Sequence, residues 1–346
     1  DLRLSRGLGD VYKRQSNLCS EITLPTGIDK EGRDRTAVCC LSSLNLETYD
    51  EWKDDENFVP DVMRFLDNVL TDFTEKAPES FSDAVYSALK ERSVGLGVMG
   101  LHSFFQQKMI PFESVMSKVW NKKIFESIQK QVDQASKDLA DERGACPDAA
   151  DYGINERFSN KTAIAPTASI SIICGGTSPG VEPIAANSYT HKTLSGSFNV
   201  RNKYLSKLLE KHGKNDDETW SSITTNQGSV SHLDFLTQQE KDVFKTAFEL
   251  DQKWIVELGA DRTPHISQAQ SINIFIPADI HKRDLHQIHF QAWKKGLKSL
   301  YYCRSKSIQR AENVNDANST DVTANVYKSK KQENQQPEYE ECLSCQ

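Results

Sequence analysis

The stretch Ser16-Asn17-Leu18-Cys19-Ser20-Glu21-Ile22-Thr23-Leu24-Pro25-Thr26 carries an amide, a thiol and a carboxylate at every second position. In an extended backbone the side chains of Asn17, Cys19 and Glu21 point to the same side, with neighbours about 6.6 Å apart. If the stretch forms a curled loop tip, the three groups converge on one small ligand, and a thiol beside an acid–base group can carry chemistry. An ordinary strand with a buried cysteine is the alternative, because free cysteine packs like a small hydrophobic residue.

The composition describes a chain with room for a large core. Its 346 residues have a formal net charge of −7 and a sequence pI near 5.7, and the length suits one large domain or two ordinary ones. No apolar run approaches the roughly 20 residues that span a bilayer, and no signal peptide opens the chain. The acidic balance gives no reason to expect a nucleic-acid surface. Eight cysteines without secretory features indicate reduced or functional thiols, which predicts a cytoplasmic protein.

Hydrophobic periodicity predicts strands that alternate with helices. Apolar side chains recur at helical spacing in several segments, and short β-rich runs separate them. We expect helices over 59–73, 119–142, 204–209, 241–258 and 284–298, and strands over 36–46, 162–171, 270–275 and 299–303. Strands separated by helices imply crossover connections, so the pattern predicts an α/β fold with a largely parallel sheet.

Two glycine- or hydroxyl-rich segments have more than one interpretation. Gly95 to Gly100 matches the GxGxxG pattern, but the polar run before it argues against a dinucleotide-binding loop, and close helix packing at small residues is the preferred interpretation. Thr167 to Ser171 is a hydroxyl-rich turn at a strand end, where free backbone N–H groups can bind a phosphate. A plain solvent loop is the alternative there.

Both ends of the chain differ from its middle. Residues 1–15 have no clear period and resemble translated adapter sequence, so we exclude them from the fold and expect the chain to be a fragment without its N-terminal part. From about residue 311 polar residues dominate, which predicts a disordered tail. Cys342 and Cys345 close that tail as a CxxC pair. A redox dithiol on a flexible arm is favoured over half a zinc site, because no partner pair has the usual spacing.

These segments together resemble the large (alpha) subunit of class I ribonucleotide reductases, over Ser16 to Gln346. The resemblance rests on SNLCSEITLPT, AVCCLSSLNL, RSVGLGVMGL, APTASISIICGGTSPGVEP, HFQAWKKGLKSLYY and the terminal ECLSC. It implies a partial ten-stranded α/β barrel with a central finger loop in residues 16–310, followed by a flexible tail in 311–346. It also implies the reduction of ribonucleoside diphosphates to deoxyribonucleoside diphosphates.

The resemblance assigns catalytic roles to individual residues. Cys19 matches the thiyl radical that abstracts the ribose 3′ hydrogen, Glu21 the base for the 3′-hydroxyl, and Asn17 a hydrogen-bonding group for the substrate. Cys39 matches one of two thiols that end as a disulfide, with its partner expected upstream, and adjacent Cys40 is interpreted as packing. Tyr301 and Tyr302 match the pair that transfers the radical.

The resemblance also implies substrate contacts, cofactors and partners. Substrate binding is expected at Ser16, Thr167, Ala168, Ser169, Ile170 and Ser171. The dithiol of Cys342 and Cys345 reduces the internal disulfide and is recharged by thioredoxin or glutaredoxin. The radical comes from a metal-containing small (beta) subunit, the chain itself binds no metal, and ATP or dNTP effectors bind mostly in the N-terminal part. A homodimer of the large subunit is expected, with no nucleic-acid or membrane partner.

Three alternatives remain open at this point. The fragment can be catalytically inert and bind only nucleotide or the small subunit. A nicotinamide-dependent dehydrogenase could be built on the GxGxxG pattern. The cobalamin-dependent reductases are related, but the tyrosine pair argues against them, because a cobalamin bound beside the site needs no long-range relay.

Overall fold

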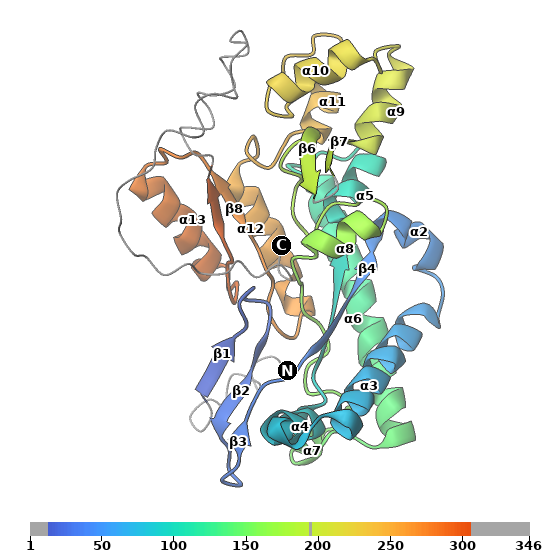
Figure 1. Cartoon of the computed structure of the whole chain (residues 1–346), viewed down its shortest axis with the longest axis vertical. Coiled ribbons are helices and arrows are strands. Elements are labelled where there is room, and N and C mark those ends of the chain that lie inside the picture. The colour runs from blue at the N-terminus through green and yellow to red at the C-terminus, as the bar shows by residue number, and fades with distance from the viewer. Residues whose placement is uncertain (1–12, 194–195, 306–346) are drawn as a thin grey trace.

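The computed structural model describes residues 13–193 and 196–305 (Figure 1). Parallel pairings link five segments of the chain. β4 (Cys40–Asn45) pairs in parallel with β5 (Val94–Met99). Bridges from Leu96 to Thr162 and from Ile164 to Gln270 add a third and a fourth segment. The fourth segment continues into β8 (Ile274–Ile276), which pairs in parallel with β9 (Cys303–Ser305). The predicted α/β fold with parallel strands is confirmed.

Helices connect these parallel segments, as parallel strands require. The main crossover helices are α3 (Phe58–Lys76) and α4 (Ser82–Glu91) before β5, α5 (Leu101–Gln107) and α6 (Val115–Arg143) after it, and α13 (Lys282–Lys294) between β8 and β9. The other helical elements are η1 (Leu46–Thr48), α2 (Tyr49–Trp52), η2 (Glu79–Phe81), α7 (Pro147–Ala150), α8 (Ala168–Ile173), α9 (Lys203–Lys211), α10 (Asp217–Thr225), α11 (Gln238–Val243), α12 (Gln252–Arg262) and η3 (Thr263–His265). Within the described ranges no helix is long and apolar enough to cross a membrane.

Antiparallel strands form the N-terminal hairpins. β1 (Lys13–Ser16) pairs with β2 (Thr23–Ile28), which in turn pairs with β3 (Asp34–Arg35). Asp29 Oδ1 closes the β2–β3 turn by accepting the backbone N–H groups of Glu31 and Arg33. Burial opposes the ionisation of Asp29, but hydrogen bonds from Tyr86, Arg35 and the turn backbone outweigh it and hold the pKa of this carboxyl well below its usual range. Further along the chain, β6 (Ser188–Thr193) pairs antiparallel with β7 (Gly196–Arg201).

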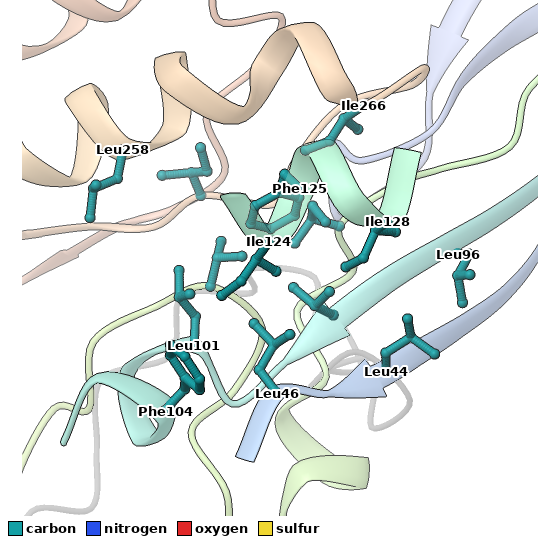
Figure 2. Close-up of a cluster of buried hydrophobic side chains, with 14 of the residues drawn as sticks. Leu44, Leu46, Leu96, Leu101, Phe104, Ile124, Phe125, Ile128, Leu258 and Ile266 are labelled. Atoms are coloured by element: carbon teal, nitrogen blue, oxygen red, sulfur yellow. The ribbon is translucent and has the colours of Figure 1, made fainter. Parts of the chain in front are cut away.

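The main hydrophobic core lies between the sheet and α6. Figure 2 shows Leu44 and Leu96 from the strands facing Ile124, Phe125 and Ile128 of α6. The predicted apolar stripe of this helix is buried along its length, at Ile124, Ile128, Val132, Ala135 and Leu139. A separate cluster forms among α9, α10 and α11, at the top of Figure 1.

A buried ion cluster fixes the ends of several helices. The Asp67 side chain of α3 is fully buried and accepts hydrogen bonds from Arg92 (2.8 Å), Arg143 (2.9 Å) and Arg157 (2.9 Å). Burial opposes ionisation of this carboxyl, but the three guanidinium groups hold its pKa below the usual value. The cluster ties α3 to the ends of α4 and α6.

The predicted single helix over 241–258 is wrong. α11 ends at Val243, and α12 begins only at Gln252. Glu249 Oε2 accepts from the backbone N–H and the hydroxyl of Thr246, and Asp251 caps α12 by accepting from the Lys253 N–H. These side-chain acceptors stabilise a turn between the two helices.

The interpretation of the GxGxxG segment as close helix packing is also wrong. The segment forms β5, a fully buried strand. A Cβ at Gly97 would lie 2.3 Å from the Ala163 carbonyl oxygen, and one at Gly95 would lie 2.4 Å from a Leu41 methyl carbon. The glycines therefore let neighbouring segments approach β5. Gly95 and Gly97 lie inside the strand and only Gly100 follows it, whereas a dinucleotide fingerprint places its glycines in the turn that follows a strand.

Candidate active site

The loop between β1 and β2 is a curled tip rather than an extended strand. Asn17 N–H donates to the Ile22 carbonyl (3.3 Å), and Ile22 N–H donates to Asn17 Oδ1 (3.1 Å). Ser20 N–H donates back to the Asn17 carbonyl, and Ser20 adopts a left-handed φ of 67°. The structure agrees with the loop that the resemblance implies and not with the alternative of an ordinary strand, because the regular alternation of an extended backbone is lost at Ser20.

Cys19 lies at this tip, beside the tyrosine pair. Its side chain is 3% exposed, and its thiol donates a hydrogen bond to Tyr301 Oη at 3.4 Å. The Tyr301 and Tyr302 rings have centroids 3.9 Å apart and an interplanar angle of 36°. Burial, followed by the hydrogen bonds with Cys19 and Tyr302, raises the pKa of Tyr301 far above its usual value, so this phenol keeps its proton. The three side chains form a continuous chain of contacts.

Glu21 is held on the other side of the tip. Its side chain is buried, and the Ser271 hydroxyl lies within hydrogen-bond distance of both the Cys19 carbonyl and Glu21 Oε2, the latter at 2.9 Å. Ala269 N–H donates to the Glu21 carbonyl (2.8 Å), and the Ser299 hydroxyl donates to the Ser20 carbonyl (2.9 Å). The loop is thus fastened to the fourth sheet segment and to the stretch that precedes β9. Ser271 and Ser299 were not predicted from the sequence, because their only signal is a hydroxyl within an apolar strand.

Cys39 lies immediately before β4, in a different environment. Gln268 Nε2 donates to Cys39 Sγ at 3.2 Å, and the Ser93 hydroxyl lies 4.0 Å from the same sulfur. Burial raises the pKa of the Cys39 thiol to about 12, although both hydrogen-bond donors act in the opposite direction. Gln268 also accepts from Thr23 N–H at the start of β2 (3.2 Å), which links Cys39 to the hairpin that carries Cys19.

The predicted substrate-binding residues fall in two places. Thr167 has a left-handed φ of 56°, and its hydroxyl accepts from Gly180 N–H at 2.7 Å. Ser171 is buried and donates to the Ala168 carbonyl, whereas Ser169 and Ile170 are exposed. These residues open the short helix α8, so the expected turn is helical from Ala168 onward. Ser16 is exposed at the end of β1, opposite Thr23, and each of these substrate contacts stays a prediction.

The described residues hold no group of three or more His, Cys, Asp or Glu side chains that could bind a metal ion. Cys342 and Cys345 lie outside these residues. Side-chain contacts link Cys19 to Tyr301 and Tyr302, and the Ser271 hydroxyl links the Cys19 carbonyl to Glu21. Gln268 connects Cys39 to the hairpin that carries this loop.

Comparison with known proteins identifies the family. The profile described as "Ribonucleotide reductase, barrel domain" matches residues 13–156 and 147–303. The chain belongs to the ribonucleotide reductase family. The family predicted from the sequence, and its barrel fold, are confirmed.

Relatives of this ribonucleotide reductase chain include two viral proteins named ribonucleoside-diphosphate reductase large subunit. The one from Invertebrate iridescent virus 6 is 53% identical over 300 residues, covering 86% of this chain and 31% of the relative. The one from Invertebrate iridescent virus 3 is 46% identical over 310 residues, covering 89% and 48%. The solved Actinobacillus ureae class Id ribonucleotide reductase alpha subunit is 40% identical with a TM-score of 0.77, covering 84% of this chain and 53% of that one. The chain spans roughly a third to a half of these relatives.

Proposed function

We propose that this chain carries the catalytic loop of a class I enzyme that reduces ribonucleoside diphosphates to deoxyribonucleoside diphosphates by a thiyl-radical mechanism. The observation that carries the proposal is the buried Cys19 thiol in hydrogen-bond contact with Tyr301, whose ring packs on Tyr302. Relatives named ribonucleoside-diphosphate reductase large subunit support the substrate class.

The tyrosine pair passes an oxidising equivalent to Cys19. A phenol can lose an electron and a proton together, so Tyr301 exchanges a hydrogen atom with the thiol over the short distance between them. The resulting sulfur radical removes the 3′ hydrogen of the ribose and later returns it, because S–H and activated C–H bonds have similar strengths. Burial of the Cys19 side chain shields this radical from water.

Glu21 acts as the general base for the 3′-hydroxyl. With the 3′ hydrogen and the hydroxyl proton removed, the neighbouring 2′-hydroxyl takes a proton from one of the two reducing thiols and leaves as water. Ser271 orients the Glu21 carboxylate from the side of the sheet. Asn17 hydrogen-bonds the substrate through its amide group.

Cys39 is one of the two thiols that supply the reducing equivalents. Two thiols give up two electrons and two protons and become a disulfide, and the ribose C2′–OH takes them up to become C–H with release of water. We assign the second thiol to a part of the protein upstream of this sequence. The tail dithiol of Cys342 and Cys345 then restores Cys39 by thiol–disulfide exchange, and thioredoxin or glutaredoxin restores the tail.

The segment 167–171 binds the substrate phosphates. Ile164 bridges to Gln270, which belongs to the segment that holds the Cys19 loop. Thr167 follows three residues later, about 10 Å further along an extended chain. That length suits a nucleotide whose ribose lies at Cys19 and whose phosphates reach the exposed Ser169 and Ile170. Ser16 borders the same substrate.

The complete enzyme requires partners beyond this chain. A small subunit with a metal centre generates the radical, and the large subunit forms a homodimer. ATP and dNTP effectors bind in the N-terminal part of the protein. We place the enzyme in the cytoplasm, where its nucleotide substrates and thioredoxin occur.

The test is a Cys19→Ser variant of the full-length protein, assayed with its small subunit. A serine hydroxyl does not form a comparable radical, so we expect deoxyribonucleotide formation to fall below detection while substrate still binds. Cys146→Ser, which removes another buried thiol, is the matched control and should retain turnover. Normal product formation by Cys19→Ser would refute the proposal.

A further inference from the structure

The side chain of Gln268 connects the two thiol environments. It is completely buried, in the segment that precedes β8. Its Oε1 accepts from Thr23 N–H at 3.2 Å, and its Nε2 donates to Cys39 Sγ at 3.2 Å and to the Val94 carbonyl at 3.4 Å. One amide therefore contacts the hairpin of Cys19, the Cys39 sulfur and the start of β5.

The neighbours of this amide fix which of its ends faces the sulfur. A backbone N–H such as that of Thr23 can only donate, so it requires the amide oxygen. The Val94 carbonyl can only accept, so it requires the amide nitrogen. Because Val94 and Cys39 share the same end of the side chain, Cys39 Sγ faces an N–H donor.

The backbone of Gln268 is anchored as firmly as its side chain. Its N–H donates to the Thr162 carbonyl at 3.0 Å, and its carbonyl accepts from Lys298 Nζ. Rotation of the amide would leave buried polar groups without partners, which is unfavourable. The donor is therefore held in place before any reaction begins.

We propose that Gln268 is a positioning residue. It holds the Cys39 sulfur at a fixed position relative to the Cys19 loop and stabilises negative charge on that sulfur during its oxidation. This inference rests on the proposed function. As Cys39 and its partner thiol give up two protons and two electrons to the ribose, the sulfur loses its proton in an environment that disfavours charge. An N–H donor aimed at the sulfur offsets part of that penalty.

The surroundings of Cys39 disfavour a negative charge on its sulfur, and a hydrogen-bond donor opposes this effect. Burial raises the pKa of the Cys39 thiol, and the negative charge of Glu91 acts in the same direction. Gln268 and Ser93 act in the opposite direction by donating hydrogen bonds. Gln268 is the closer of the two donors, at 3.2 Å against 4.0 Å.

The experiment uses the full-length large subunit with its small subunit and a thioredoxin reducing system. Gln268→Met keeps the length of the side chain and removes the N–H donor. Gln268→Glu also removes the N–H donor but keeps an oxygen that can accept from Thr23 N–H. The substrate carries tritium at the ribose 3′ position, and both tritium released to water and deoxyribonucleotide formed are measured. When reduction by Cys39 is slow, the label stays longer on the Cys19 sulfur and exchanges with water.

We expect both variants to lower kcat by about tenfold to a hundredfold with an unchanged KM. Tritium released per product formed should rise several-fold. This ratio does not depend on the fraction of folded enzyme, so a merely structural role would leave it unchanged. Gln106→Leu removes another buried glutamine, one that contacts His102 and Asn202, and should leave the ratio at the wild-type value.

Two outcomes would overturn the inference: a wild-type kcat in both variants, or a fall in kcat without a change in the tritium ratio. Cys39→Ser separates this failure from failure of the proposed function. If Cys39→Ser forms product normally, the role proposed for Cys39 is wrong. If Cys39→Ser is inactive and the Gln268 variants behave as wild type, only the role of Gln268 is wrong.

Discussion

The surroundings of Cys19 and of Cys39 differ in the type of group that faces the sulfur. Cys19 lies at the tip of the β1–β2 loop against the phenol of Tyr301. Cys39 lies before β4 against the amide of Gln268. A phenol can exchange a hydrogen atom with a thiol, whereas an amide is not oxidised and can only donate a hydrogen bond. The neighbours thus suit one thiol to one-electron chemistry and the other to the formation of a disulfide.

One short segment supports both regions. Gln268 contacts Cys39, the next residue donates its N–H to the Glu21 carbonyl, and Ser271 contacts the Cys19 carbonyl. The two thiols therefore share a scaffold although their chemical surroundings differ. Substitutions that affect one region alone test whether this division of roles is correct.

The largest expected effect comes from Tyr301→Phe, which removes the hydroxyl proposed to exchange a hydrogen atom with Cys19. Phenylalanine keeps the ring packing on Tyr302 but has no hydroxyl hydrogen to exchange with Cys19. We expect product formation to fall at least about 10⁴-fold, with unchanged substrate affinity. Steady-state assays and nucleotide-binding titrations measure the two quantities.

Tyr86→Phe is the control for this change, because Tyr86 is a buried tyrosine that bonds to Asp29 and Glu31. It should retain turnover. Substantial turnover by Tyr301→Phe would show that the radical reaches Cys19 by another route.

Glu21→Gln should have the next largest effect. The amide keeps the size of the side chain and can still contact Ser271, but it cannot accept the 3′-hydroxyl proton. We expect kcat to fall by about 10²- to 10⁴-fold with little change in KM. A wild-type kcat would exclude Glu21 as the base.

Asp67→Asn tests the buried ion cluster, which we expect to contribute stability and no chemistry. It removes the charge that holds Arg92, Arg143 and Arg157, and we expect the thermal unfolding midpoint to fall by about 5–10 °C. The folded-state pKa of Asp67 is lowered, so the wild-type contribution is present above its ordinary pKa of about 3.9 and is lost as the pH falls through the folded-state pKa.

Differential scanning calorimetry at neutral and acidic pH checks both parts of this prediction. The difference in midpoint between wild type and Asp67→Asn should shrink as the pH is lowered. The activity per folded molecule should stay close to wild type, and an altered tritium ratio at neutral pH would contradict the separation of stability from chemistry.

Ser271→Ala should have the smallest effect. It removes one hydroxyl that orients Glu21 and the Cys19 carbonyl, and we expect kcat to fall about 3- to 10-fold. Ser136→Ala is a suitable control, since the buried Ser136 hydroxyl has no hydrogen-bond partner among the described residues. Equal effects of the two substitutions would argue against an orienting role for Ser271.

The elements with a regular hydrophobic period were predictable from the sequence. The apolar stripes of α3 and α6 gave their positions, although α6 begins four residues before the expected start at residue 119. The curled tip and the pairing of Cys19 with Tyr301 followed from the family resemblance, because 282 residues separate the two side chains and no local pattern connects them.

The supporting residues were not predictable in this way. Gln268 meets Cys39 across 229 positions of sequence, and Ser271 meets Glu21 across 250. A buried glutamine or serine has no periodic signature, and its role depends on which distant atom it contacts. The break between α11 and α12 was missed for a related reason, since Thr246 and Glu249 stabilise a turn where the apolar pattern continues.

Release of tritium from the ribose 3′ position tests the central claim most directly, in full-length Cys19→Ser and Cys39→Ser enzymes with the small subunit present. The account predicts that Cys19→Ser releases no tritium and forms no product, because nothing breaks the C–H bond. It predicts that Cys39→Ser still releases tritium but forms no deoxyribonucleotide. Tritium release by Cys19→Ser, or its absence in Cys39→Ser, would contradict the assignment of one-electron and two-electron chemistry to these two thiols.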